Sequence, residues 1–198
     1  MRLGAAVLGL AVAAAAAPAQ AQPQAQPPTY AQRWAALCAN CHGSEGVSTT
    51  PDTPSLAGQP AFYAATQLFL FRAGRRTNAA MTAVASTLSD DDLRGFSDLI
   101  GRLPDASLPP AADADAARMA RARDIARRNQ CTQCHGADLA GGAQVPRLAG
   151  QREDYLRRVL REFKQARRVG YTQAMNEALV PASADELDLL AYFLSRVR

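Results

Sequence analysis

The sequence predicts an all-α protein built from two tandem domains. Its 198 residues fit one large domain or two small ones, and an internal repeat favours two. Residues 54–59 read P-S-L-A-G-Q and residues 146–151 read P-R-L-A-G-Q. Apolar residues recur at helical spacing, and no segment shows the alternation typical of a strand. Further pairs match in the same order, at offsets of 92 to 94 positions: Tyr63 and Tyr155, Leu68 and Leu160, Phe71 and Phe163, Arg75-Arg76 and Arg167-Arg168, Met81 and Met175, Leu93 and Leu187, Ile100 and Leu194.

Residues 1–21 are predicted to be an export signal. A positively charged start precedes an apolar run from Leu3 to Ala17, and small residues then form A-x-A patterns that end at Ala21. The run is short for a membrane span of about 20 apolar residues, which favours cleavage over an uncleaved anchor. We expect cleavage after Ala21, an exported mature chain and a flexible Gln/Pro/Ala tail at residues 22–28.

The two copies are predicted to occupy residues 29–103 and 116–198, on either side of a Pro-, Ala- and Asp-rich linker at residues 104–115. Charge divides unevenly along the chain. Residues 22–116 hold six basic and nine acidic side chains, a balance of −3, whereas residues 117–198 hold fifteen and nine, a balance of +6. Such a dipolar surface would orient the protein towards its partners; the alternative is that the Arg-rich helices are simply solvated.

Each copy is expected to contain the same series of helices. The first runs into a cysteine motif, at residues 30–41 and 116–134. After an irregular segment with Gly and Pro, a second helix is expected at residues 62–73 and 153–168, where apolar side chains recur at helical spacing.

The last helix of each copy is predicted to begin with a capping box. Ser89 and Ser183 supply the hydroxyl at the cap, and Asp92 and Glu186 supply the carboxylate three residues later. The buried stripes that follow are Leu93, Phe96 and Ile100 in the first copy and Leu187, Leu190 and Leu194 in the second.

One pentapeptide occurs twice. Residues 38–42 read C-A-N-C-H and residues 131–135 read C-T-Q-C-H, and together they hold all four cysteines and both histidines of the chain. In C-x-x-C-H, two thiols can each add to a vinyl group of one haem while the adjacent histidine meets the iron from one face. The predicted covalent attachment sites are Cys38 and Cys41 for one haem c and Cys131 and Cys134 for a second, with His42 and His135 as axial ligands.

Two other uses of these cysteines are disfavoured. Zinc would need four nitrogen or sulfur ligands per site, and each copy offers two cysteines and one histidine. Two disulfides would leave unexplained the histidine beside each pair. A covalent haem would also supply the apolar mass that a domain of about 80 residues with few aromatic side chains lacks.

The predicted sixth ligands are methionines. Both histidines are used beside their cysteines, so an iron with two histidine ligands is impossible within this chain. Met81 follows His42 by 39 residues, and Met175 follows His135 by 40. Met119 has no counterpart and is expected to fill the core. A thioether favours ferrous iron, so His/Met ligation raises the reduction potential.

The surroundings of the ligands are predicted from the repeat. A ligating imidazole presents one nitrogen to iron, and its other N–H requires an acceptor. The carbonyls of Pro54 and Pro146 are the candidates, the alternative being a simple turn-forming role. The pairs Arg75-Arg76 and Arg167-Arg168 either counter the haem propionates or belong to a solvated face.

The mature chain closely resembles the cytochrome c4 family, diheme c-type cytochromes of the bacterial periplasm. The resemblance rests on the two C-x-x-C-H motifs, both P-x-L-A-G-Q runs, the Arg-Arg pairs ahead of Met81 and Met175, and the closing helices. It implies two tandem cytochrome c-like domains packed together, each wrapped around one covalently attached haem with His/Met iron. The first copy carries an insertion at residues 44–53, and Ala166 stands where the first copy has Gly74; neither change affects the ligands.

The resemblance implies electron transfer, by a soluble or loosely membrane-associated protein, from a quinol-oxidising cytochrome bc complex towards a terminal oxidase. Two filled coordination spheres favour an electron carrier over an enzyme. One alternative is a cytochrome subunit of a periplasmic dehydrogenase, such as a flavoprotein-linked sulfide oxidiser. Another is a diheme peroxidase, which would need a releasable coordination position and acid–base groups beside it. No nucleic-acid partner is expected.

Overall fold

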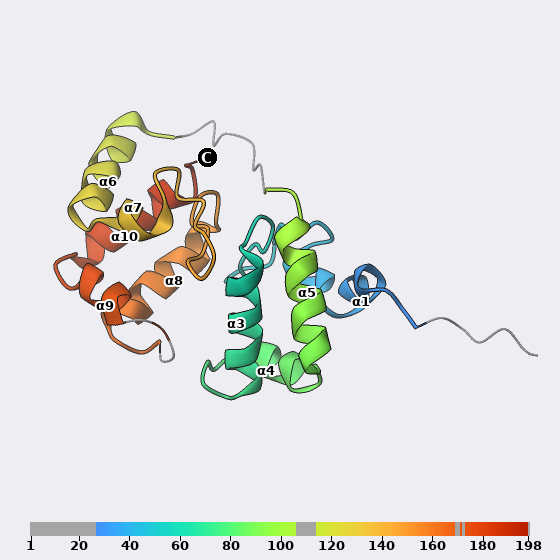
Figure 1. The fold of residues 1–198 in the computed structure, drawn as a ribbon. Coiled ribbons are helices and arrows are strands. Elements are labelled where there is room, and N and C mark those ends of the chain that lie inside the picture. Colours follow the sequence, from blue (N-terminus) through green and yellow to red (C-terminus); the bar gives the residue numbers. More distant parts are fainter. Residues whose placement is uncertain (1–26, 106–113, 169–170, 172, 198) are drawn as a thin grey trace, which may run out of the picture.

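The computed structural model describes residues 27–105, 114–168, 171 and 173–197. The predicted export signal and most of the predicted tail and linker lie outside these ranges. Figure 1 shows two groups of helices side by side, one formed by α1 to α5 and the other by α6 to α10.

The same series of five helices occurs in both groups. The first domain contains α1 (Tyr30–Leu37), α2 (Ala39–His42), α3 (Ala61–Arg72), α4 (Ala79–Ser86) and α5 (Asp90–Arg102). The second domain contains α6 (Ala116–Arg128), α7 (Cys131–His135), α8 (Glu153–Lys164), α9 (Gln173–Leu179) and α10 (Ala184–Leu194). Within the described ranges the only β-type pairing is an isolated bridge between Gly142 and Val145. The prediction of an all-α fold with two tandem domains is confirmed.

The helix expected to run into each cysteine motif is broken in both domains, so that part of the prediction is wrong. The first break is at Cys38, which has φ −114° and separates α1 from α2. The second is at Gln130, which adopts the left-handed conformation with φ 54°. The cysteines and histidine of each motif therefore lie on, or directly before, a separate short helix.

Two short helices, α4 and α9, were not predicted. Half of the residues of α4 are alanine, and the helix has no amphipathic stripe that a periodicity argument could detect. These helices position the two candidate methionine ligands, because Met81 lies on α4 and Met175 on α9.

Helix packing is similar in the two domains. Helix α5 packs against α3 in the first, and α10 packs against both α6 and α8 in the second. The predicted stripes are buried, with Leu187, Leu190 and Leu194 almost completely covered. The predicted capping boxes are present too, since Ser89 and Ser183 each accept a hydrogen bond from the backbone three residues later.

Within the described residues, no helix combines the length and apolar character that crossing a membrane requires.

Candidate haem sites

The two histidines occupy equivalent environments at the ends of α2 and α7. Each is only 6% exposed. Nδ1 of His42 lies 2.9 Å from the carbonyl oxygen of Pro54, and Nδ1 of His135 lies 2.9 Å from that of Pro146. A carbonyl oxygen only accepts, so Nδ1 carries the hydrogen and the lone pair resides on Nε2. This tautomer is the one that an axial iron ligand requires.

Both imidazoles are held neutral. Burial lowers the pKa of His42, the hydrogen bond to Pro54 raises it in part, and the positive charge of Arg76 lowers it again. Burial likewise lowers the pKa of His135, against the opposing effect of the hydrogen bond to Pro146. Near neutral pH, Nε2 of each ring is therefore free of a proton.

The cysteines are available for covalent attachment, because all four are free thiols. Cys38 and Cys131 are half-buried, whereas Cys41 and Cys134 are exposed. Burial raises the pKa of Cys38 to about 11 and also raises the pKa of Cys131. The thiols of Cys38 and Cys131 are therefore protonated near neutral pH.

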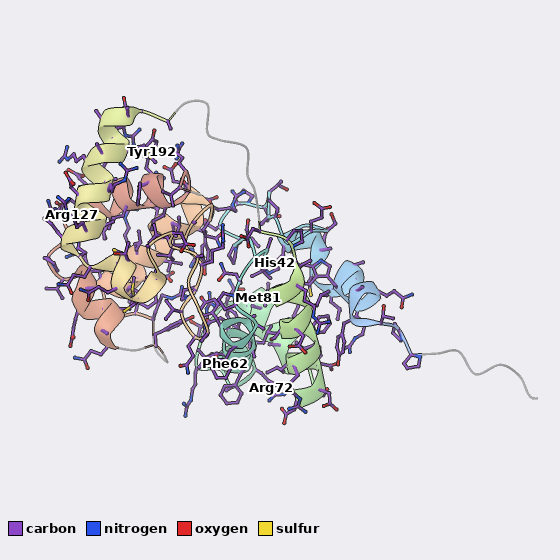
Figure 2. The ribbon with its side chains drawn as sticks, turned by 45° about the horizontal axis from the view of Figure 1, so that its top comes forward. His42, Phe62, Arg72, Met81, Arg127 and Tyr192 are labelled. Atoms are coloured by element: carbon purple, nitrogen blue, oxygen red, sulfur yellow. The ribbon has the colours of Figure 1, made fainter. Side chains whose placement is uncertain are left out.

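The candidate sixth ligands lie on equivalent helices of the two domains. Met81 and Met175 are both half-buried, and Met175 packs against the core of the second domain. Asn78 caps α4 by accepting a hydrogen bond from the Met81 amide at 3.0 Å. Figure 2 labels His42 and Met81, which come from different helices of the first domain. Met119 packs against the second core on α6, as expected for a filler side chain.

Each arginine pair divides into one exposed side chain and one that is at least partly buried. Arg75 and Arg167 are exposed. Arg76 donates to Gln67 Oε1 at 2.7 Å and, across the interface, to the Tyr155 hydroxyl at 3.2 Å. Arg168, with a side chain only 7% exposed, bonds to Glu162. The solvated role considered for these pairs fits Arg75 and Arg167 alone, and a role against the haem propionates stays a prediction.

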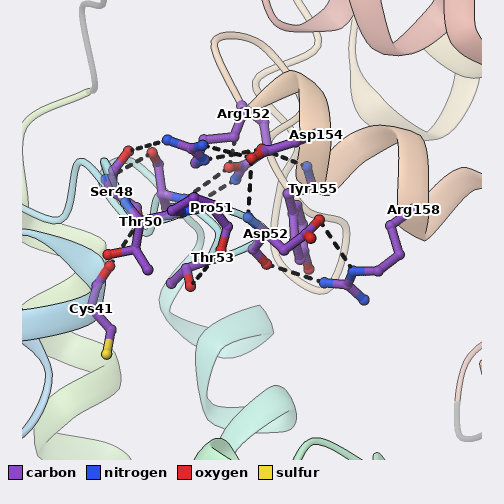
Figure 3. Close-up of polar contacts among 12 residues, drawn as sticks. Cys41, Ser48, Thr50, Pro51, Asp52, Thr53, Arg152, Asp154, Tyr155 and Arg158 are labelled. Atoms are coloured by element: carbon purple, nitrogen blue, oxygen red, sulfur yellow. Dashed lines mark hydrogen bonds and ion pairs between the residues drawn. The ribbon is translucent and has the colours of Figure 1, made fainter.

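The insertion of the first domain contacts the second domain. Arg152 donates to the Ser48 carbonyl at 3.1 Å, and the Asp52 amide donates to Asp154 at 3.0 Å. Arg158 donates to the Asp52 carbonyl at 3.2 Å. The Ser48 hydroxyl in turn donates to the Cys41 carbonyl at 2.8 Å, so this network ends beside a haem-attachment residue (Figure 3).

Two buried glutamines were missed by sequence reasoning. Gln59 and Gln151 end the repeated P-x-L-A-G-Q runs, and each bonds to the backbone of the opposite domain. Gln59 pairs with the amide and carbonyl of Arg147 at 3.2 and 2.9 Å. Gln151 pairs with those of Ser55, both at 2.8 Å. The sequence shows that the glutamine recurs in both runs, but it does not show that each glutamine bonds to the opposite domain.

Comparisons with known proteins agree with this geometry. Residues 25–98 match the family model "Cytochrome C oxidase, cbb3-type, subunit III", and residues 119–198 match "Cytochrome c". A cytochrome c4 of Pseudomonas aeruginosa is 30% identical over 82% of this chain and 85% of its own length. The chain belongs to the cytochrome c4 family.

Two further relatives extend the comparison. The "Thiosulfate dehydrogenase electron acceptor" of Stutzerimonas stutzeri is 32% identical over 82% of this chain and 80% of its own length. The crystal structure of reduced cytochrome c4 from Pseudomonas stutzeri superposes with a TM-score of 0.76 at 28% identity, covering 85% of this chain and 97% of that one.

Membership in the cytochrome c4 family, the two tandem domains and the two covalent haem c groups are thereby confirmed. The residues present fit the cofactor, since each domain offers two free thiols and a neutral, buried histidine with Nε2 available. The protein is an electron carrier and not an enzyme.

Proposed function

We propose that this cytochrome c4 carries single electrons in the periplasm from a quinol-oxidising cytochrome bc complex towards a terminal oxidase. Each bound haem supplies an iron that alternates between ferric and ferrous states. The ligands are His42 with Met81 in the first domain and His135 with Met175 in the second. The observation that carries the proposal is the duplicated site, in which a buried neutral histidine and a matched methionine recur in both domains.

The matched ligands support carriage of electrons without a chemical conversion. A histidine and a methionine on each iron would leave no coordination position for a substrate and would engage both nitrogens of each histidine. The role left to the chain is to bury each haem, set its potential and present an edge to partner proteins.

The periplasmic location is supported by the apolar run and A-x-A patterns of residues 1–21.

A second candidate donor is a periplasmic dehydrogenase. A flavoprotein-linked sulfide oxidiser is one example, but the similarity to a thiosulfate dehydrogenase electron acceptor favours a dehydrogenase that oxidises thiosulfate. Stopped-flow reduction of the purified protein by a cytochrome bc complex and by a thiosulfate dehydrogenase would separate the two. Fast reduction by the dehydrogenase alone would overturn the respiratory assignment.

The axial ligands are tested by single substitutions. Purified protein should contain two haems per chain and low-spin iron at both. Met81→Ala and Met175→Ala should each convert one haem to a high-spin form and lower its midpoint potential, because the thioether that favours ferrous iron is lost. Met119→Ala, which removes a packed methionine outside both sites, is the matched control and should leave both spectra unchanged.

Spectroscopy at low temperature reports the spin state of each iron, and a redox titration reports the two midpoint potentials. One haem per chain, or a high-spin iron in the unsubstituted protein, would contradict the proposal.

A further inference from the structure

The glutamines of the two P-x-L-A-G-Q runs form a reciprocal pair of contacts between the domains. Gln151, from the second domain, accepts a hydrogen bond from the Ser55 amide and donates one to the Ser55 carbonyl. Gln59, from the first domain, makes the same two contacts with Arg147. Ser55 and Arg147 occupy the same position in the two runs, directly after the proline. The glutamine of each domain therefore bonds to the backbone of the same repeat position in the other domain.

The backbone amide that each glutamine contacts belongs to the peptide group that orients a haem ligand. The Ser55 N–H and the Pro54 C=O are the two ends of one peptide group, and that C=O accepts the hydrogen bond from His42 at 2.9 Å. Arg147 and Pro146 stand in the same relation to His135. A continuous chain of hydrogen bonds thus runs from a glutamine of one domain, through one peptide group, to the histidine of the other.

Burial and backbone conformation hold these chains in place. Gln59 and Gln151 are only 5% and 6% exposed, so their amide groups bond to protein instead of water. The glycine before each glutamine has a positive φ, 68° at Gly58 and 69° at Gly150. A Cβ on Gly58 would lie 2.3 Å from Asp105 Oδ1 and 3.3 Å from the Arg147 side chain. The positive φ favours glycine at Gly58, and a Cβ there would crowd the Asp105 and Arg147 side chains, which pair with each other.

We propose that Gln151 and Gln59 are positioning residues that act in trans, each setting the histidine hydrogen bond, and with it the reduction potential, of the haem in the opposite domain. Hydrogen bonds in a chain polarise one another. A glutamine oxygen that accepts from the peptide N–H makes the peptide C=O a stronger acceptor. A stronger acceptor makes the imidazole a more basic ligand, and a more basic ligand stabilises the ferric state. This proposal rests on the axial roles of His42 and His135 given above.

The direction of the effect follows from this chain. Removing Gln151 weakens the hydrogen bond between Pro54 and His42, so the midpoint potential of the first-domain haem should rise. Removing Gln59 should raise that of the second-domain haem. A residue that only holds the domains together would affect both haems alike, or the haem of its own domain.

The test uses Gln151→Leu and Gln59→Leu in the full-length, haem-loaded protein. Leucine fills similar space and makes no hydrogen bond. In a redox titration, Gln151→Leu should raise the midpoint potential of the first-domain haem and leave that of the second-domain haem unchanged. Gln59→Leu should raise the midpoint potential of the second-domain haem alone. Met81→His and Met175→His, each of which should lower the potential of one haem, assign the two waves to the domains. A shift at the haem of the substituted domain, an equal shift at both haems, or no shift would overturn the proposal.

Amide hydrogen exchange gives a second readout that is independent of the assignment of the iron ligands. Exchange at the Ser55 amide should accelerate in Gln151→Leu, and exchange at the Arg147 amide should accelerate in Gln59→Leu. If the methionine substitutions fail to move one wave each, the ligand assignment is wrong, whereas unchanged exchange at Ser55 and Arg147 contradicts the contacts themselves.

Glutamate variants cover the case in which the leucine variants fail to fold. Gln151→Glu keeps an oxygen that accepts from the Ser55 amide and loses the donor to the Ser55 carbonyl. The potential of the first-domain haem should stay level or fall. A rise in this variant would contradict the role given to the accepted hydrogen bond.

Discussion

Arg76 and Arg168 occupy equivalent positions in the repeat but bond to different groups. Arg168 bonds to the Glu162 carboxylate at 2.9 Å and to the Tyr171 hydroxyl at 3.0 Å. The groups that Arg76 contacts, Gln67 and Tyr155, are uncharged. These two partners carry no negative charge that would offset that of Arg76, and the Arg76 charge contributes to the lowered pKa of His42. Arg76 therefore makes the surroundings of the first haem more positive.

Arg76→Met should lower the midpoint potential of the first-domain haem. Removal of a nearby positive charge stabilises the ferric state relative to the ferrous state, and the partial burial of Arg76 limits screening by solvent. A redox titration at constant ionic strength measures the shift. Arg75→Met removes the neighbouring exposed charge and should have a much smaller effect; equal effects of the two substitutions would contradict this account.

Residue-level prediction from the sequence reaches what one repeat contains or what the two repeats share. The C-x-x-C-H motif identifies the haem-attachment sites, and the axial roles of Met81 and Met175, inferred from their matching positions, stay predictions. For the arginine pairs the sequence leaves two roles, contact with the haem propionates or a solvated face, because helical spacing does not show which domain a side chain faces. Gln59 and Gln151 were missed for the same reason, since each bonds to the opposite domain and no periodicity within one domain records that contact.

At the scale of the element, α3 and α8 end in the same motif with different residues. The Gly74 amide donates to the Phe71 carbonyl at 3.1 Å, and the Arg75 amide donates to the Leu70 carbonyl at 2.9 Å. The corresponding bonds from Ala166 and Arg167 measure 3.0 and 2.9 Å. This is the Schellman motif, which requires a positive φ at the first residue after the cap. Gly74 has φ 66° and Ala166 has φ 51°.

Ala166→Gly should stabilise the protein. The left-handed conformation costs a non-glycine residue about 1 kcal/mol, and the greater freedom of glycine in the unfolded chain offsets part of that gain. We expect a net increase of about 0.5 kcal/mol in the free energy of unfolding, measured by urea denaturation. Gly74→Ala is the reciprocal control. No heavy atom would lie within 4 Å of the new Cβ, so its destabilisation should reflect the backbone alone. A loss of stability in Ala166→Gly would show that its methyl group packs productively.

Helices were predictable where a stripe of apolar residues marks one face. Helix α8 follows this rule, with Tyr155, Val159, Leu160 and Phe163 all buried. Helices α4 and α9 escaped prediction because they are short, and α4 carries no such stripe. The breaks at Cys38 and Gln130 also escaped it, because neither residue is a glycine or proline that would mark the end of a helix.

At the scale of the whole molecule, some of the positively charged side chains of the second domain take part in the contact with the first domain. Part of the basic surplus of the second domain faces the first, where Arg152 and Arg158 bond to the carbonyls of Ser48 and Asp52. Solvation, one of the two uses considered for the Arg-rich helices, therefore does not describe these side chains. Further exposed arginines lie on α6, among them Arg121 and Arg123, and these are available to orient partner proteins.

The acid stability of the domain interface should depend on Asp154. The Arg152 guanidinium, with help from the Asp52 and Tyr155 amides, lowers the pKa of Asp154 to about 2, compared with about 3.9 for an unfolded chain. A carboxylate with a lowered pKa stabilises the folded state fully above about pH 4, and that contribution disappears as the pH falls through about 2. The side chain is 35% exposed, so solvent screening limits its contribution to about 1 kcal/mol.

Asp154→Asn should therefore lower the free energy of unfolding by about 1 kcal/mol at pH 7, and the difference from the unsubstituted protein should shrink between pH 4 and pH 2. Urea denaturation of both proteins across this range, at fixed ionic strength, measures the difference. Asp188→Asn is the matched control, because Asp188 pairs with Arg161 inside the second domain. Hydrogen exchange at the Asp52 amide, which donates to Asp154, should accelerate in Asp154→Asn and not in Asp188→Asn. A stability difference that stays constant from pH 7 to pH 2 would mean that the Asp154 charge does not stabilise the contact between the two domains.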